Sequence, residues 1–213
     1  RRNVMAAGIA AGVLPVLPRR AGERSRSVLG EPIVVASSNG NQYKNGGTQT
    51  CVEIAFARLT AGGDPLDAVV DGVNVVELDP GEMSVGYGGL PNADGVLQLD
   101  SCCMHGPKRW AGGVAALEGV RTPSRVAKAV AESTDHHLLV GAGAQAFARQ
   151  MGFAIEADLN TEASRKAWLE WKRRSDPEHY LKPEQREQIG FEVAQAMARE
   201  GWFDPQHIHG TIT

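Results

Sequence analysis

Hydrophobic and polar residues follow two different periods along the chain, and each period predicts one kind of element. Apolar positions three and four residues apart, typical of one helix face, recur over residues 47–61, 64–78, 123–133 and 143–151. Short apolar or β-branched runs, typical of strands, occupy residues 31–38, 96–104, 110–117 and 137–140. The pattern therefore predicts a protein that contains both helices and strands.

The first predicted strand and the helices after it suggest how the elements pack. Residues 31–38 are expected to be buried on both faces, because their apolar run is continuous rather than alternating. Residues 39–41 predict a sharp polar turn. Asp64 and Pro65 mark a helix start as N-cap and first helical residue. Since two helices follow one strand through short links, both are expected to pack on the same sheet face.

A glycine-rich segment covers residues 79–95. It lacks the G-x-G-x-x-G spacing and the following helix that a phosphate-binding loop needs. We interpret it as a structural loop whose glycines let the backbone approach a neighbour closely. The nearby carboxylate pairs are interpreted as solvated loop charges, and they are Glu77 with Asp79 and Asp94 with Asp100.

The region from residue 160 to residue 206 is expected to be a helical excursion on the surface. A charged helix begins at Thr161, and Trp168 and Trp171 form its single packed stripe. A second, amphipathic helix is predicted over residues 187–200.

A possible nucleophile lies in the last residues of the chain, where Gly210 and Thr211 precede β-branched residues. If the bond between them were cut, Thr211 would carry a free α-amine beside its hydroxyl, so one residue would hold both base and nucleophile. The plainer interpretation is a loop that enters a strand.

The first 30 residues differ from the rest. Paired arginines, a short apolar run and a second basic stretch have the layout of a twin-arginine signal, and a disordered tail is the alternative. We therefore expect an exported or periplasmic protein, with a cytoplasmic location as the alternative. The apolar run is too short to span a bilayer, so no membrane insertion is expected. The chain lacks an initial methionine and stops within an apparent strand, so we expect a fragment, or a subunit with a little of the next subunit attached.

Composition excludes several other functions. A net charge of -3 over 213 residues does not indicate the excess of basic residues that is typical of proteins that bind nucleic acid. Three cysteines without C-x-x-C spacing argue against a zinc site, and the adjacent Cys102 and Cys103 would point to opposite faces of a strand as small buried residues. His207 and His209 have H-x-H spacing but no third ligand, so no metal site is predicted.

Taken together, several motifs resemble the α-subunit of the glycosylasparaginases, which are N-terminal nucleophile hydrolases. The resemblance covers residues 31–213. Its most specific part is S-V-G-Y-G-G at residues 84–89, flanked by Asp79 and Asp100. The helix with Thr161, Trp168 and Trp171 favours glycosylasparaginases over the related isoaspartyl peptidases.

The resemblance implies an α+β fold, a four-layer αββα sandwich of two stacked sheets flanked by helices. Residues 31–210 would form the α-subunit portion, and residues 211–213 would begin the β-subunit. Thr211 would be the catalytic nucleophile, freed when the precursor cuts itself after Gly210. The implied activity is hydrolysis of the side-chain amide of asparagine or glycosylated asparagine.

Two departures from the family pattern concern the site. Glycosylasparaginases usually have Asp at the position of Gly210, where Gly is the isoaspartyl peptidase pattern. We expect Gly210 to tolerate the strained backbone of an acyl shift, and His209 to assist that step. The turn after the first strand carries Ser38 and Asn39, where well-known members have a tryptophan that lines the pocket. Ser38 and Asn39 are therefore the predicted substrate-pocket residues.

The resemblance also sets the expected partners. They are a small asparagine or β-aspartyl substrate, the β-subunit from the same precursor, and a second copy in an (αβ)2 assembly. No metal or organic cofactor is expected. An isoaspartyl peptidase or L-asparaginase of the same superfamily is the first alternative function, and a catalytically silent scaffold or binding protein is the second.

Overall fold

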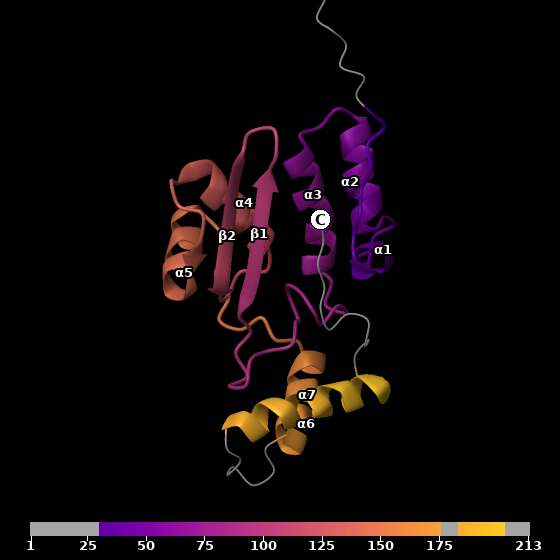
Figure 1. The fold of residues 1–213 in the computed structure, drawn as a ribbon, viewed down its shortest axis with the longest axis vertical. Coiled ribbons are helices and arrows are strands. Elements are labelled where there is room, and N and C mark those ends of the chain that lie inside the picture. Colours follow the sequence, from indigo (N-terminus) through magenta and orange to yellow (C-terminus); the bar gives the residue numbers. More distant parts are fainter. Residues whose placement is uncertain (1–29, 176–182, 203–213) are drawn as a thin grey trace, which may run out of the picture. The chain divides into compact units, whose positions relative to one another are not determined.

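A computed structural model describes residues 30–175 and 183–202. From residue 51 onward the elements follow the predicted order (Figure 1), whereas residues 39–42 form a short helix instead of the predicted turn. The first half contains α1 (Asn39–Gln42), α2 (Cys51–Thr60), α3 (Pro65–Glu77), β1 (Leu99–His105) and β2 (Trp110–Leu117). The second half contains α4 (Pro123–Ser133), β3 (Leu139–Val140), α5 (Gly141–Gln150), α6 (Glu162–Ser175) and α7 (Pro183–Arg199). The coarse prediction of an α+β protein is confirmed.

Local capping explains where the first long helices begin. Thr50 and Glu53 form a capping box at the start of α2, because each side chain accepts from the other residue's backbone N–H. Asp64 caps α3 through the backbone N–H groups of Leu66 and Asp67, and Pro65 is its first residue. These starts are local properties of the sequence, and the Asp64 and Pro65 prediction is confirmed.

The described residues contain one three-stranded sheet in the order β1-β2-β3. The pair β1 and β2 is antiparallel, and β2 pairs with β3 in parallel. Helices α4 and α5 contact β2, and α4 lies behind the strands in Figure 1. The main core lies between these helices and the sheet, and its fully buried members include Val114, Leu117, Val126, Val130 and Ala148.

Glycine makes this helix contact possible on β2. A methyl group at Gly112 would come within 2.3 Å of the carbonyl oxygen of Ala127 in α4. The helix backbone therefore rests directly on the strand backbone at this point. Any larger residue would push α4 away from the sheet.

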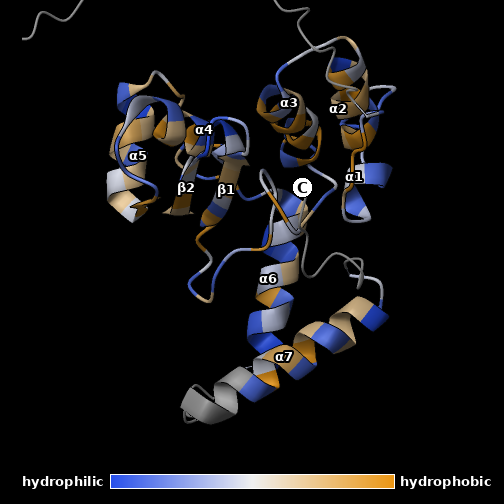
Figure 2. Cartoon of the chain, turned by 45° about the horizontal axis from the view of Figure 1, so that its top comes forward, coloured by the Kyte–Doolittle hydropathy of each residue, from blue (hydrophilic) through white to orange (hydrophobic). Residues whose placement is uncertain are grey.

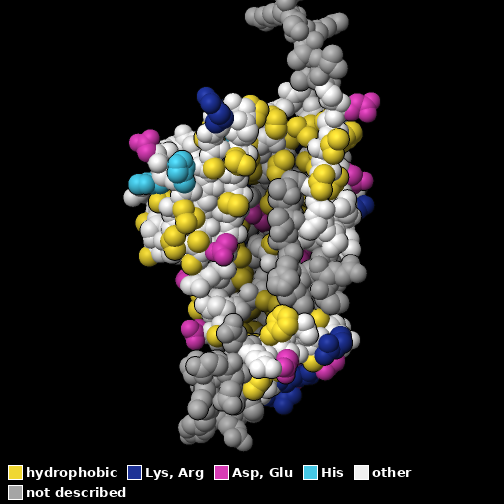
Figure 3. Space-filling model, in the orientation of Figure 1, with side chains coloured by type: hydrophobic (Ala, Val, Ile, Leu, Met, Phe, Trp, Pro, Cys, Tyr) yellow, Lys and Arg dark blue, Asp and Glu magenta, His cyan; other side chains and the backbone are white. Residues whose placement is uncertain are grey.

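The other sheet face carries no helix of the described region. Cys102 and Met104 point to this face, and Met104 is 75% exposed. Register places Gly113 and Ala111 opposite them on β2. At these four positions the open face has small or apolar side chains, and exposed Asp100 follows on the same side of β1. Figure 3 shows hydrophobic side chains on the side of the molecule that faces the viewer in Figure 1.

The adjacent cysteines follow the expected alternation. Cys103 packs against the core, whereas Cys102 is exposed on the open face. The prediction of opposite faces is confirmed, but the expectation that both are buried is wrong for Cys102. Cys51 is buried, and burial raises the pKa of its thiol to about 11.

The expectation of a buried strand over residues 31–38 is wrong. The segment has only an isolated bridge at Ala36, and Ile33 and Val35 are 82% and 65% exposed. A strand buried on both faces needs neighbours along both edges and over both faces. The described residues do not surround this segment in that way.

Helix α6 is mostly polar, whereas polar and apolar residues alternate along α7 (Figure 2). Trp171 on α6 donates from its indole nitrogen to the carbonyl oxygen of Gly190 on α7, at 3.1 Å. Trp168 instead packs on Gly95, where a methyl group would lie 2.9 Å from the indole ring. The expectation of a single stripe is therefore wrong, since the two tryptophans pack against different segments.

Candidate active site

The predicted nucleophile segment, Thr211 with Gly210 and His209, lies outside the described residues. The same holds for His207 and for the signal-like residues 1–29. Among the described residues, no three His, Cys, Asp or Glu side chains group as a metal site would require. No described helix has both the length and the apolar character needed to cross a membrane.

The predicted pocket residues, Ser38 and Asn39, lie where α1 begins. Asn39 is fully buried, and its Oδ1 accepts from the Ser37 hydroxyl at 2.5 Å and from the Gly40 backbone at 2.9 Å. Its Nδ2 atom is buried and has no hydrogen-bond partner among the described residues. An unpaired buried donor costs about 1–3 kcal/mol, so this amide is available to an acceptor.

The glycine-rich segment comes close to its neighbours, as predicted. The Tyr87 backbone N–H donates to the Glu77 carbonyl oxygen at 2.7 Å. Gly86 has a φ of +63°, and a methyl group there would lie 2.2 Å from the same oxygen. On its other side the Gly88 backbone donates to the Leu159 carbonyl at 3.0 Å. The loop is thus held between the end of α3 and the segment that leads into α6.

Replacing Gly86 by alanine is expected to lower the free energy of unfolding by about 3 kcal/mol, because the new methyl group meets backbone in a left-handed conformation. Urea unfolding of the two proteins measures the difference. Gly106→Ala is the control, since nothing lies within 4 Å of that position and its φ is not in the left-handed region. Equal stability of the two variants would contradict the close approach at Gly86.

Glu82 fixes the turn that starts this loop. Its carboxylate is fully buried and accepts from the Ser84 hydroxyl at 2.5 Å and from the backbone N–H groups of Ser84 and Val85 at 2.8 and 2.7 Å. A carboxylate with this many donors can remain buried, because its lone pairs are satisfied.

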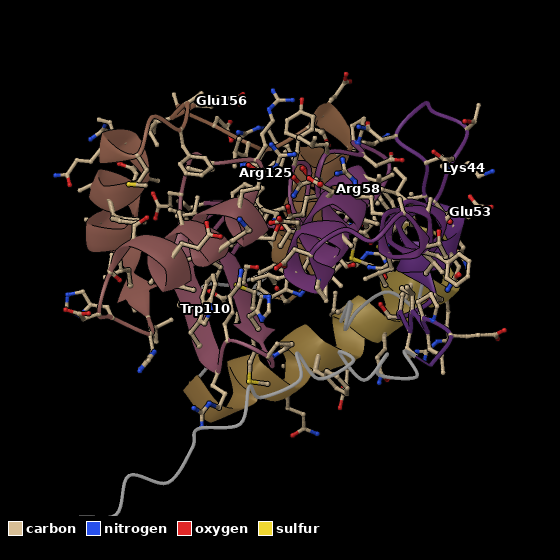
Figure 4. All side chains as sticks on the ribbon, turned by 90° about the horizontal axis from the view of Figure 1, so that it is seen from above. Lys44, Glu53, Arg58, Trp110, Arg125 and Glu156 are labelled. Atoms are coloured by element: carbon tan, nitrogen blue, oxygen red, sulfur yellow. The ribbon has the colours of Figure 1, made fainter. Side chains whose placement is uncertain are left out.

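A buried polar cluster joins α3 to the start of α4. The Glu77 carboxylate accepts from the Ser124 hydroxyl at 2.7 Å, from the Ser124 backbone at 3.0 Å and from the Asn74 amide at 2.6 Å. Arg125, labelled in Figure 4, donates to the Asn74 side-chain oxygen. Glu77 therefore holds two helices with its side chain and the glycine-rich loop with its backbone.

The interpretation of Glu77 as a solvated loop charge is thus wrong, whereas Asp94 and Asp100 are exposed as expected. Asn74 and Glu77 lie three residues apart on the apolar side of α3. Two polar residues within an apolar stripe were the signal for this cluster in the sequence. Their partner Ser124, 47 residues beyond Glu77, could not be identified from spacing.

Burial raises the pKa of Glu77 to about 7 from its ordinary value of 4.5. The folded state thus binds the proton more tightly than the unfolded chain does. The resulting stability is present in full below the unfolded pKa, and it is lost as pH rises through the folded pKa. We therefore expect the parent protein to lose stability from about pH 5 to about pH 8 relative to Glu77→Gln. Urea unfolding across this range measures the difference, and parallel pH profiles of the two proteins would contradict the burial effect.

Tyr87 connects the glycine-rich loop to the ion pair between Arg121 and Glu156. The Arg121 guanidinium lies 3.7 Å from the centre of the Tyr87 ring and donates to both oxygens of Glu156, at 2.6 and 2.7 Å. This bidentate pair holds the pKa of Glu156 below its ordinary value. The loop is therefore fixed on a third side.

His105 looks like a candidate base but is fully engaged. Its Nε2 lies 2.9 Å from the Asp64 carboxylate, and its Nδ1 accepts from the Lys108 backbone at 3.1 Å. Its ring is stacked on Trp110 and is buried. With both nitrogens occupied, His105 ties the turn between β1 and β2 to the start of α3.

Comparison with known proteins decides the family. A family model described as asparaginase, Asparaginase_2, matches residues 31–212. The chain belongs to the asparaginase family. This match includes Gly210 and Thr211 as well as the glycine-rich loop.

Among curated relatives, the chain is 42% identical over 160 residues to an N(4)-(beta-N-acetylglucosaminyl)-L-asparaginase of Elizabethkingia miricola. The matched region covers 75% of the chain and 44% of that relative. It is 38% identical over 159 residues to the protein of that name in Mus musculus, over 72% of the chain and 44% of the relative. A plant-type L-asparaginase of Pyrococcus abyssi is 45% identical over 112 residues, over 53% of the chain and 36% of the relative.

These matches confirm the resemblance to glycosylasparaginases and to their family of N-terminal nucleophile hydrolases. The chain spans less than half the length of these relatives, 44% of each glycosylasparaginase.

Proposed function

We propose that the protein containing this chain is an amidohydrolase that cleaves the side-chain amide of asparagine or glycosylated asparagine. The observation that carries the proposal is the match to glycosylasparaginases over three quarters of the chain. Thr211 is the proposed nucleophile, and it lies within the residues that the family model matches. No metal or organic cofactor takes part in this proposal.

Self-cleavage would create the active residue. The Thr211 hydroxyl attacks the carbonyl carbon of Gly210, and the peptide C–N bond breaks as the nitrogen takes up the proton. Water then hydrolyses the resulting ester, which leaves a carboxylate on Gly210 and a free amine on Thr211. Glycine at position 210 supports this step because it adopts strained backbone conformations at low cost. His209 is proposed to position the scissile bond.

The mature site would use both groups of Thr211. Its α-amine accepts the hydroxyl proton while the oxygen attacks the side-chain amide carbon of the substrate. The proton passes to the departing ammonia or glycosylamine, and a β-aspartyl ester remains on Thr211. Water, activated by the same amine, hydrolyses that ester to aspartate and regenerates the hydroxyl.

Ser38 and Asn39 are proposed to line the substrate pocket. The buried Asn39 Nδ2 has no partner in the part of the chain that the structure describes, and this supports the role, because a substrate carbonyl or carboxylate oxygen is an acceptor of the required kind. Ser38 is small, which leaves room for a bulky leaving group.

The complete fold is proposed to be the four-layer αββα sandwich. The apolar open face of the sheet, with exposed Met104 and Cys102, supports a second sheet stacked upon it. That sheet would come from the β-subunit portion of the same precursor. We further propose an (αβ)2 assembly and export by the twin-arginine layout of residues 1–30.

A pair of substrates tests the activity. The full-length protein is expected to release aspartate from GlcNAc-asparagine with a kcat/KM at least about tenfold above that for a β-aspartyl dipeptide. Coupled detection of aspartate measures both rates. Hydrolysis of the dipeptide alone would contradict the glycosylasparaginase assignment.

Hydrolysis of the dipeptide alone would support the alternative function, an isoaspartyl peptidase or L-asparaginase. Two observations favour it. Gly210 matches the isoaspartyl peptidase pattern, and the plant-type L-asparaginase of Pyrococcus abyssi is 45% identical over 112 residues. The same assay therefore separates the two members of the family.

A further inference from the structure

A groove with a volume of about 550 Å³ lies between the glycine-rich loop, the end of β2, helix α5 and the start of α6. Its size is in the range of small-molecule sites. Neither Ser38 nor Asn39 is among the described residues that line it. The lining side chains important to its chemistry are Glu118, Gln145, Arg149, Glu156, Asp158 and Arg165.

Most charges in this groove are already neutralised. Glu156 forms the bidentate pair with Arg121, and Asp158 pairs with Arg165. These ions hold the walls together and have little charge left for a ligand. The backbone adds rigidity, because Glu156 donates to the Gly119 carbonyl oxygen at 2.8 Å.

Two opposite charges in the groove have no ionic partner among the described residues. Within the described ranges, the Glu118 carboxylate accepts a hydrogen bond only from the neutral amide of Gln98, at 2.8 Å. In the same part of the chain, the Arg149 guanidinium donates only to the side-chain oxygen of Gln145, at 3.4 Å. Neither side chain is therefore neutralised by an ion pair of the described residues.

Gln145 is hydrogen-bonded to both of these residues. Its Nε2 donates to the backbone carbonyl of Glu118 at 3.2 Å, and its Oε1 faces Arg149. Gln145 thus bridges the backbone of the acidic residue and the side chain of the basic residue. A groove lined by one unpaired charge of each sign favours a small molecule that carries both an ammonium and a carboxylate group.

We propose that this groove binds a small zwitterion, an α-amino acid, with its ammonium group on Glu118 and its carboxylate on Arg149. A simple anion would bind Arg149 but would be repelled by the Glu118 carboxylate. A simple amine would bind Glu118 but would be repelled by the Arg149 guanidinium. Only a zwitterion satisfies both groups at once. The proposal does not depend on Thr211 chemistry.

Hydrogen exchange of the full-length protein with L-serine as the probe tests this site. Serine is expected to slow exchange of the α5 amides near Gln145 and Arg149 in a saturable manner. Glu118→Gln and Arg149→Gln are each expected to weaken this protection about tenfold. Arg173→Gln, an exposed charge on α6, is the matched control and should leave it unchanged.

Comparison ligands make the test specific. Ethanolamine lacks the carboxylate and lactate lacks the ammonium, so both are expected to protect α5 at least about tenfold more weakly than serine. Thr211→Ala should retain full protection, which separates this site from the proposed catalytic one. The proposal is overturned by absence of protection at about 10 mM serine, by equal protection from lactate or ethanolamine, or by unchanged affinity in Glu118→Gln.

Discussion

Replacing Thr211 by alanine is expected to abolish both self-cleavage and amide hydrolysis in the full-length protein. The substitution removes the hydroxyl that attacks the Gly210 carbonyl, so the precursor would remain one chain. It also removes the nucleophile of the mature site, and kcat/KM should fall by at least about a thousandfold. A denaturing gel measures cleavage, and aspartate release measures hydrolysis.

Two further substitutions make this result specific. Thr211→Ser retains a hydroxyl and should still cleave, although more slowly. Thr213→Ala changes a neighbouring threonine in the same segment and should leave both reactions intact. Two bands of normal size from Thr211→Ala would refute the nucleophile assignment. One band from the parent protein, with Thr211→Ala behaving identically, would instead favour a catalytically silent scaffold.

Replacing Glu77 by alanine is expected to lower the free energy of unfolding by about 3–5 kcal/mol. The substitution leaves the Ser124 N–H and the Asn74 amide without their buried acceptor, and it opens a cavity between α3 and α4. The loop should loosen as well if the cavity shifts the end of α3, because the Glu77 backbone carbonyl, which the substitution retains, accepts from the Tyr87 backbone N–H. Urea unfolding gives the free energy, and hydrogen exchange of residues 84–89 reports on the loop.

Glu77→Gln tests hydrogen bonding apart from volume. Either orientation of the glutamine amide directs an N–H group at a donor of Asn74 or Ser124, so a loss of about 1–3 kcal/mol is expected. Glu162→Ala is the control, since Glu162 lies exposed in the first turn of α6. If Glu77→Ala were no less stable than Glu162→Ala, the cluster would have no structural role.

Local signals account for the parts of the fold that were predictable. The start of α3 follows from Asp64 and Pro65, whose capping geometry depends on neighbouring residues alone. The alternation of Cys102 and Cys103 follows from the period of a strand. Each of these features depends on residues within one turn or one strand, so sequence spacing was sufficient.

Long-range contacts account for the parts that were missed. Ser124 lies 47 residues from Glu77, and only the packing of α4 beside α3 makes the two hydrogen-bonding partners. Trp168 and Trp171 have the spacing of one helix stripe, but Gly95 and Gly190 receive them separately. Exposure of Ile33 and Val35 likewise depends on which strands lie beside them, a property that their own hydrophobicity does not contain.

The sequence by itself determined the family, the order of most elements and the candidate nucleophile Thr211. Motifs and helix caps depend on residues that are close together in the sequence, so they can be identified without the structure. Tertiary structure alone decided that Glu77 is buried, that the Asn39 amide has no acceptor among the described residues and that Glu118 and Arg149 share one groove. The physical reason is that burial and charge pairing depend on residues brought together by packing. Such partners have no fixed separation along the chain.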